Sequence, residues 1–137
     1  MFEWHARNVQ LRCLIVDDNI SFLAASRAIL EGHQLTVVGE ATNGAEALMR
    51  ADELHPDVIL LDIDLGEDSG LEVARQLGAR SGNSTAKVIL ISAHPAEDFA
   101  ELVEESPALG FLSKSELSAG AVGDLLDKAN GPQDVRS

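Results

Sequence analysis

The sequence has few basic residues and no long hydrophobic run, and each shortage excludes a class of protein. It holds 10 Lys and Arg against 23 Asp and Glu, which gives a formal net charge of −13. This charge repels nucleic-acid phosphates and anionic lipids, so we expect no direct contact with nucleic acid or with a membrane. No apolar run approaches the ~20 residues of a membrane span, and residues 1–10 contain no signal-peptide core. We therefore expect a cytoplasmic protein.

Cysteine is also scarce, since Cys13 is the only one. It has no partner for a disulfide within the chain and lies in an apolar run, so we interpret it as a small buried residue in a reducing compartment. The 137 residues, 45% of them hydrophobic, suffice for one domain with an ordinary core. We predict an N-terminal extension over 1–10, a folded domain over 11–128 and a polar tail over 129–137.

Short apolar runs alternate with segments of helical spacing along the chain. Five runs predict strands over residues 11–16, 35–39, 58–61, 88–91 and 109–112. Between them apolar residues recur at helical spacing, as at Phe22, Ala25 and Ile29. Repeated strand–helix units predict an α/β fold with a doubly wound parallel sheet, because right-handed crossovers place helices on both faces. In such sheets ligands bind at the carboxyl ends of the strands.

Residues that favour helix ends support this alternation. The predicted N-caps of the second, third and fifth helices are Asn43, Ser69 and Ser115. Pro95 suits the first turn of the fourth helix, and two glycines, Gly32 and Gly78, stand near helix ends.

Acidic residues end two of the predicted strands. Asp17 and Asp18 follow the first, and Asp62 follows the third, with Asp64 two residues later. If both strands are central, these carboxylates converge and repel each other, and a hard divalent cation relieves that repulsion. Mg²⁺, or Mn²⁺, suits such an oxygen-rich site. One Asp after a strand is usually a turn or cap residue, but two strands that end alike favour a site.

The fourth and fifth strands end in groups that complement the acids. Ser92 supplies a hydroxyl donor and Lys114 supplies a compact cation at the same edge of the sheet. A hydroxyl and an ammonium beside a metal-binding carboxylate cluster suit the binding of a phosphoryl group.

The segments that carry these residues resemble, in order and spacing, the receiver domain of two-component response regulators. They read VDDN, LLDIDLGEDSGLEVA, LISAH and GFLSKSEL, and the resemblance covers about residues 11–128. It implies a flavodoxin-like (βα)5 fold with strand order 2-1-3-4-5. It also implies that Asp62 is the phospho-acceptor, that Asp17 and Asp18 are an acidic metal pair, and that the carbonyl of Asp64 is a further metal ligand. Ser92 and Lys114 would contact the phosphoryl oxygens, and Phe111 would be an aromatic switch residue.

The same resemblance implies the partners. The donor is a phosphohistidine of a histidine kinase or phosphotransfer protein, and Ile20 is our candidate contact for the kinase helix. The readout surface is helix four, strand five and helix five, with an apolar stripe at Phe99, Leu102 and Val103. This readout surface would contact an output domain, a partner protein, or a second copy of the chain in a homodimer formed on phosphorylation. We expect no turnover of a separate substrate.

Several positions depart from the family pattern. Ser115 follows Lys114 where receivers often have proline, and a cis bond before a non-proline residue costs about 2.5–4 kcal/mol, which favours a trans bond. Gly66 replaces another frequent proline and should loosen the loop after Asp62. Asp64 and His94 occupy the variable positions where a hydrolytic water approaches. His94 either orients that water or is a solvated loop residue.

Two other functions are compatible with parts of the pattern. The Asp-x-Asp of LLDIDLG also occurs in haloacid-dehalogenase-type phosphatases, which form an aspartyl phosphate, although that family usually has the motif near its N-terminus. A receiver fold that docks partners without phosphorylation is the second alternative. GFLSKSEL is similar to regulators that carry a helix-turn-helix domain. The 137 residues leave no room for one, so we expect a stand-alone receiver or part of a longer regulator.

Overall fold

A five-stranded parallel sheet forms the centre of the protein. The structure is a computed structural model and describes residues 10–32, 35–79, 86–94 and 100–136, with the backbone alone for 128–136. The strands are β1 (Leu11–Val16), β2 (Leu35–Ala41), β3 (Val58–Asp62), β6 (Lys87–Ser92) and β7 (Gly110–Ser113). Their spatial order is β2-β1-β3-β6-β7 and all pairs are parallel. Counted along the chain this is 2-1-3-4-5, so the predicted order is confirmed.

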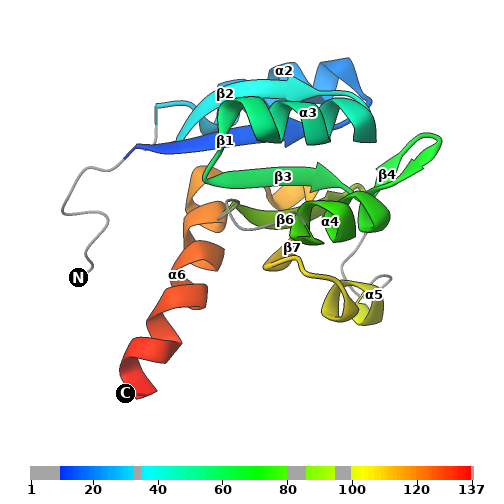
Figure 1. The fold of residues 1–137 in the computed structure, drawn as a ribbon. Helices are drawn as coiled ribbons and strands as arrows, with labels where there is room; N and C mark the ends of the chain where they lie inside the picture. The colour runs from blue at the N-terminus through cyan, green and yellow to red at the C-terminus, as the bar shows by residue number, and fades with distance from the viewer. Residues whose placement is uncertain (1–9, 33–34, 80–85, 95–99, 137) are drawn as a thin grey trace.

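Helices cover both faces of the sheet (Figure 1). On one face α2 (Ile20–Leu30) and α6 (Ala119–Arg136) pack against a cluster that includes Ile15 and Leu60. On the other, α3 (Gly44–Leu54), α4 (Gly70–Ala79) and α5 (Ala100–Glu105) pack against a cluster that includes Leu14 and Leu61. The side chains of neighbouring residues in one strand thus pack on opposite faces of the sheet. The continuous apolar runs follow from this burial on both faces.

The caps of the helices are only partly those that the sequence predicted. Asn43 accepts the Glu46 N–H at 2.9 Å and caps α3, as predicted. Ser69 is also confirmed, since its Oγ accepts the Glu72 N–H at 3.4 Å at the start of α4. The prediction for Ser115 is wrong, and Pro95 lies outside the described residues.

The last helix begins later than expected because the segment after Lys114 forms a short 3-10 turn, η2 (Lys114–Glu116). The buried Leu117 side chain follows it and anchors the chain in the core. Ser118 then caps α6, with its Oγ 3.0 Å from the Ala121 N–H. The helix continues to Arg136, so it runs past residue 128, where the sequence suggested a polar tail (Figure 1).

Helix α2 buries a different stripe from the one predicted. Leu23, Ser26 and Leu30 are its buried residues, whereas Ala25 and Ile29 are exposed. Packing against the sheet decides this phase, because Leu23 and Leu30 belong to the core cluster while Phe22 is only half-buried beside it. The Asn19 side chain accepts the Phe22 N–H at 3.1 Å and caps the helix, which begins at Ile20.

The predicted helix-end glycines differ from each other. Gly32 follows α2 with φ of +90°, a left-handed conformation that glycine adopts without strain. Gly78 also stands near a helix end, as the second-to-last residue of α4, but its φ is not positive. A Cβ atom there would come within 2.9 Å of the Pro107 side chain, so its role is close packing and not a left-handed turn.

A two-stranded hairpin follows the third strand and was not predicted. It pairs β4 (Asp64–Leu65) with β5 (Asp68–Ser69) and turns through Gly66, whose φ is +73°. The Asp68 carboxylate accepts the Gly44 N–H at 2.8 Å and ties the hairpin to the start of α3. The sequence led us to expect a loosened loop here, but Gly66 instead provides the left-handed residue that closes the turn.

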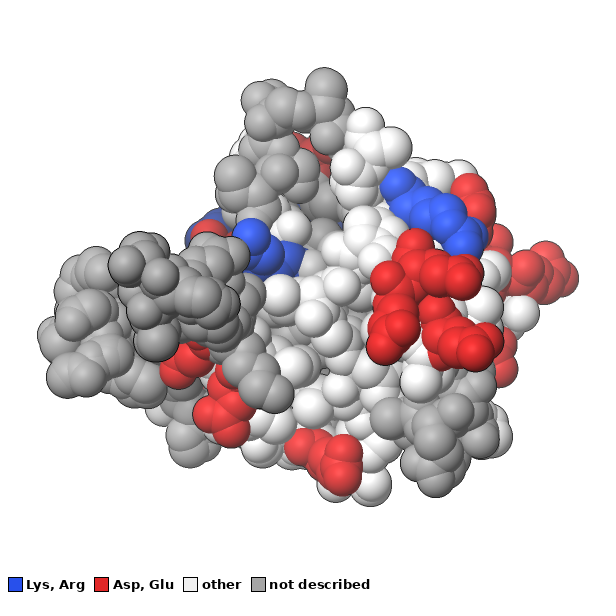
Figure 2. Space-filling model, turned by 90° about the horizontal axis from the view of Figure 1, so that it is seen from below, with Lys and Arg blue, Asp and Glu red and all other residues white. Residues whose placement is uncertain are grey.

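Acidic side chains are more prominent than basic ones on the face shown in Figure 2. The Asp and Glu side chains form separate groups there, the largest of them beside basic side chains, with uncharged atoms in the centre of the face. This agrees with the net charge of −13. Within the described part of the chain, no helix combines the length and the apolar character needed to cross a bilayer.

Gly70 generates a prediction about the fold, because its backbone lies against that of the third strand. Its N–H donates to the Ile63 carbonyl at 2.7 Å, and a Cβ atom would overlap the Asp62 carbonyl oxygen and lie 2.6 Å from Ile63 Cα. We expect Gly70→Ala to lower the free energy of unfolding by about 1–3 kcal/mol, since backbone atoms cannot move aside cheaply. Urea denaturation measures this.

The matched control is Gly120→Ala. At Gly120 the nearest heavy atom to a Cβ is Ser118 Oγ at 3.8 Å, and the residue lies in α6. Alanine there should be neutral or stabilising by up to about 1 kcal/mol. Equal stability of Gly70→Ala and the wild type would contradict the close backbone approach.

Candidate functional site

The carboxyl ends of four strands meet at one edge of the sheet and deliver the predicted site residues there. Asp17 and Asp18 follow β1, Asp62 ends β3, Ser92 ends β6 and Lys114 follows β7. The register aligns these ends, since Val16 pairs with Leu61, Asp62 with Ile91, and Ser92 with Ser113. The convergence follows from parallel pairing, as the sequence suggested.

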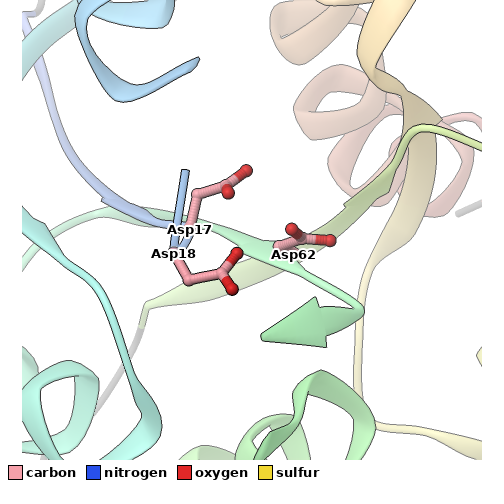
Figure 3. Close-up of side chains that lie close together, drawn as sticks. All are labelled: Asp17, Asp18 and Asp62. Carbon is pink, nitrogen blue, oxygen red and sulfur yellow. The ribbon is translucent and has the colours of Figure 1, made fainter. Parts of the chain in front are cut away.

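Three carboxylates form the centre of this edge. Each of Asp17, Asp18 and Asp62 offers an oxygen, and these oxygens lie within 4.8 Å of one another. Figure 3 shows the two side chains from the end of β1 and that of Asp62 gathered around a shared space. Asp17 is fully buried and Asp62 is 5% exposed, whereas Asp18 faces solvent.

Asp17 is held by the helix start that follows it. Its Oδ1 accepts the Asn19 N–H at 2.9 Å, and Asn19 is the cap of α2. Its Oδ2 is buried and makes no well-directed hydrogen bond, although Lys114 Nζ lies 2.7 Å away. A buried carboxylate oxygen with only an ion-pair partner is a good candidate metal ligand.

Lys114 is the cation that faces this cluster. Its Nζ is 2.7 Å from Asp17 Oδ2, 3.3 Å from Asp62 Oδ2, and 4.4 Å from the centre of the Phe22 ring. Partial burial lowers the pKa of Lys114, but the two carboxylates outweigh this and raise it. The Lys114–Ser115 bond is trans, as all described peptide bonds are. The lysine therefore reaches Asp62 without a proline after it.

The pKa of Asp62 is raised to about 6. Burial is the main cause, and the charge of Asp17 adds to it. The Asp64 N–H, which donates to Asp62 Oδ1 at 3.0 Å, and the Lys114 ammonium act in the opposite direction. An acid that ionises only near pH 6 beside other carboxylates would bind a cation readily at neutral pH.

The side chains of the remaining predicted residues are not part of the carboxylate cluster. Ser92 is buried, and its Oγ accepts the His94 N–H at 3.0 Å. Phe111, paired with Leu90, is half-buried against the core on the α3 and α4 side. The Asp64 side chain is exposed, so only its backbone belongs to the centre of the site.

The charges and donor atoms of this cluster fit a divalent cation. Every ion pair of the three carboxylates in the described part of the chain goes to one ammonium, that of Lys114. Carboxylate oxygens this close leave a surplus of negative charge, and a hard cation neutralises it with its preferred ligands. Mg²⁺ fits because Asp18 faces water, so the ion would keep water ligands.

Sequence reasoning missed the residues that support the site. Asn19 is a good N-cap type directly before a helix, a signal that was present but not used. Phe22 was assigned to an apolar stripe, and nothing in its spacing indicated a contact with Lys114. Gly70 gave no signal either, because its role depends on how closely α4 approaches β3.

Comparison with known proteins identifies the family. The model of the response regulator receiver domain matches residues 13–122. The chemotaxis protein CheY of Listeria monocytogenes is 35% identical over 119 residues, which are 87% of this chain and 98% of CheY. The transcriptional regulatory protein YdfI of Bacillus subtilis is 36% identical over 108 residues, which are 78% of this chain and 49% of YdfI.

A solved structure agrees with this result. The signal receiver domain of NarL from Mycobacterium tuberculosis has a TM-score of 0.75 and 33% sequence identity, and the match covers 90% of this chain and 98% of that one. The chain thus spans about half the length of some curated relatives, such as YdfI and a Pseudomonas aeruginosa regulator, and nearly all of CheY.

The raised pKa generates a prediction about stability without metal. The folded protein binds the Asp62 proton more tightly than the unfolded chain, so ionisation between pH 3.8 and about 6 lowers the free energy of unfolding. Asp62→Asn removes this cost, and we expect a gain of about 1–2 kcal/mol at pH 7.5 in metal-free buffer. The gain should vanish below pH 3.8 and shrink when Mg²⁺ is added.

Urea denaturation at three pH values, with chelator or with Mg²⁺, measures this gain. Asp124→Asn is the control, because that carboxylate is exposed on α6. A metal-free Asp62→Asn protein that is less stable than the wild type at pH 7.5 would refute the cost of ionising Asp62 described above.

Proposed function

The chain belongs to the response regulator receiver family, and we propose that Asp62 is the residue that accepts its phosphoryl group, with Mg²⁺ bound beside it. The phospho-acceptor function in two-component signalling is that of the family. One observation carries the assignment to Asp62. This carboxylate is buried, faces Asp17 and Asp18, and is paired with Lys114 at 3.3 Å.

The chemistry follows from this arrangement. An Asp62 oxygen attacks the phosphorus and a new O–P bond forms. The N–P bond of a phosphohistidine breaks, and its electron pair stays on the imidazole nitrogen, which takes any proton it needs from water. Such transfers depend on position and charge neutralisation more than on nucleophile strength. Lys114 and Ser92 would bind the phosphoryl oxygens as cation and hydroxyl donor.

The metal would be held by Asp17, Asp18, Asp62 and the carbonyl of Asp64. Mg²⁺ supplies charge neutralisation for the incoming phosphoryl group. The phosphatase alternative loses its main support, because the exposed Asp64 side chain is not part of the carboxylate cluster. We expect signalling without turnover of a separate substrate.

The conformational change on phosphorylation would begin at Ser92 and pass to β7 at the edge of the sheet. Its hydroxyl accepts the His94 N–H, so the hydroxyl proton is available to a phosphoryl oxygen. A shift of Ser92 toward Asp62 would open space beside β7, into which Phe111 turns. Val103 of α5 packs in the same cluster as Phe111, and Leu102 is 43% exposed. The surface of α5, β7 and α6 is thus our proposed readout; Phe99 lies outside the described residues.

The partners that we propose are those of the family. A histidine kinase or histidine phosphotransfer protein would donate the phosphoryl group, and an output domain, a partner protein or a second copy of the chain would read it. Relatives named as transcriptional regulators support an output domain of that kind. A cytoplasmic location belongs to this proposal, because a kinase charges its histidine from ATP inside the cell.

Labelling by a small phosphodonor tests the acceptor. Acetyl phosphate or phosphoramidate with Mg²⁺ should add one phosphoryl group to the wild type, as intact-mass spectrometry measures, and none to Asp62→Asn. Asp124→Asn, an exposed carboxylate on α6, should be labelled like the wild type. Chelation of Mg²⁺ should reduce labelling at least 10-fold, since a 1.4 kcal/mol loss of charge stabilisation suffices for that factor. An unlabelled wild type would favour the interaction module instead.

Ile20 tests the kinase contact separately. Its side chain is 68% exposed at the first position of α2, directly after the cap of that helix. We expect Ile20→Glu to slow transfer from the phosphohistidine donor that labels the wild type by 10-fold or more, because it replaces an apolar contact with a charge. Labelling by acetyl phosphate should not change. Met49→Glu, a 49% exposed residue on α3, is the control. Equal transfer to Ile20→Glu and the wild type removes Ile20 from the interface.

A further inference from the structure

The ring of Phe22 supports the ammonium of Lys114, and no motif in the sequence assigned this contact. Nζ lies 4.4 Å from the centre of the ring, well inside the ~6 Å range of cation–π attraction. We propose that Phe22 is a positioning residue, which holds Lys114 at the acceptor during phosphoryl transfer. This inference rests on the function proposed above.

Phe22 is itself fixed at both ends of its backbone. Its N–H donates to the Asn19 side chain at 3.1 Å, and its carbonyl accepts from the Ser26 hydroxyl. The side chain is half-buried and packs against the cluster between the sheet and α2 and α6. A ring held in this way offers a defined face to the lysine.

The contacts around Phe22 form a closed circuit with the acidic site. Asp17 Oδ1 accepts the Asn19 N–H, Asn19 caps Phe22, the Phe22 ring contacts Lys114, and Lys114 Nζ returns to Asp17 Oδ2 at 2.7 Å. One residue of this circuit binds the acceptor as well, since Lys114 also pairs with Asp62. The start of α2 and the lysine are therefore positioned together.

The segment that carries Lys114 gives it little support of its own. Lys114 begins the short η2 turn, and the two residues after it, Ser115 and Glu116, are exposed. The Ser113 and Ser115 hydroxyls bond each other at 3.1 Å, at the exposed surface. Besides the two carboxylates, Nζ contacts the ring of Phe22 on α2, which packs against the core. An opposing element thus supports the lysine.

A neutral ring suits this role for an electrostatic reason. Both carboxylate partners of Lys114 have a second task, because Asp17 would bind the metal and Asp62 would bind the phosphoryl group. A third carboxylate would hold the ammonium but would repel the phosphoryl oxygens. The ring attracts a cation through its quadrupole and carries no net charge. Phe22 can therefore keep Lys114 in place while the carboxylates change partners.

The contact can be measured without metal or donor. The chain has three lysines, Lys87, Lys114 and Lys128, so ¹³C-lysine labelling gives a simple spectrum in which Lys114→Met identifies one signal. The ring should shift the Lys114 ε-CH₂ protons upfield. Phe22→Leu should abolish this shift and Phe22→Tyr should retain it. An ε-CH₂ signal unchanged in Phe22→Leu would show that the contact does not exist and would overturn the proposal.

Rates of labelling by acetyl phosphate with Mg²⁺ test the role. We expect Phe22→Leu to be labelled about 3- to 10-fold more slowly than the wild type, the range that a partly exposed cation–π contact supports. Phe22→Tyr should stay within about 2-fold, as its ring has the same attraction. Phe22→Met is a second ring-less variant in case Phe22→Leu folds poorly, and Ile29→Ala on the exposed side of α2 is the control.

A double-variant cycle separates positioning from general damage to the helix. In a Lys114→Met background Phe22→Leu should have no further effect, because the residue through which it acts is gone. An equal slowing in both backgrounds, or wild-type rates in Phe22→Leu and Phe22→Met, would overturn the proposal. In either case a wild type that is labelled leaves the proposed function intact. An unlabelled wild type overturns both.

Discussion

The mutual repulsion of three carboxylates at one edge of the sheet is the constraint on which the rest of the site depends. Asp17, Asp18 and Asp62 crowd within 4.8 Å, two of them buried, and their ion pairs among the described residues go to Lys114. Proteins tolerate such crowding where the surplus charge is used. Here the surplus charge keeps the Lys114 ammonium beside Asp17 and Asp62. Under the function that we propose, it would also draw a cation to Asp62, so charges that cost stability in the free protein would prepare the site for a phosphoryl group.

The hydrophobic core enforces this crowding. β1 and β3 are buried along most of their lengths and paired side by side, so the residues that follow them have no freedom to move apart. The start of α2 adds a second layer of control through Asn19 and Phe22. The core thus fixes the positions of the three carboxylates, and the start of α2 helps to orient the Asp17 carboxylate and the Lys114 ammonium.

Apolar runs located the strands, and polar residues at their ends located the site, because both signals are local in sequence. What failed depends on tertiary contacts. Ser115 resembled a cap, yet the buried Leu117 delays α6, and α2 buries another stripe than predicted because Leu23 and Leu30 pack into the core. Gly66 suggested a loose loop, whereas its left-handed backbone closes a hairpin. The contact of Phe22 with Lys114 joins segments that are far apart in the sequence, and no spacing rule reaches across them.

The close approach of Gly70 to the third strand makes the packing on the two sides of Asp62 unequal. On one side α4 rests on the backbone at Asp62 and Ile63, so that part of the chain has little room to move. On the other side β7 is an edge strand whose residues are all half-buried, and α5 has no fully buried residue. If Asp62 is modified, we therefore expect the sheet to adjust toward β7, the edge where local opening costs least, and not toward α4.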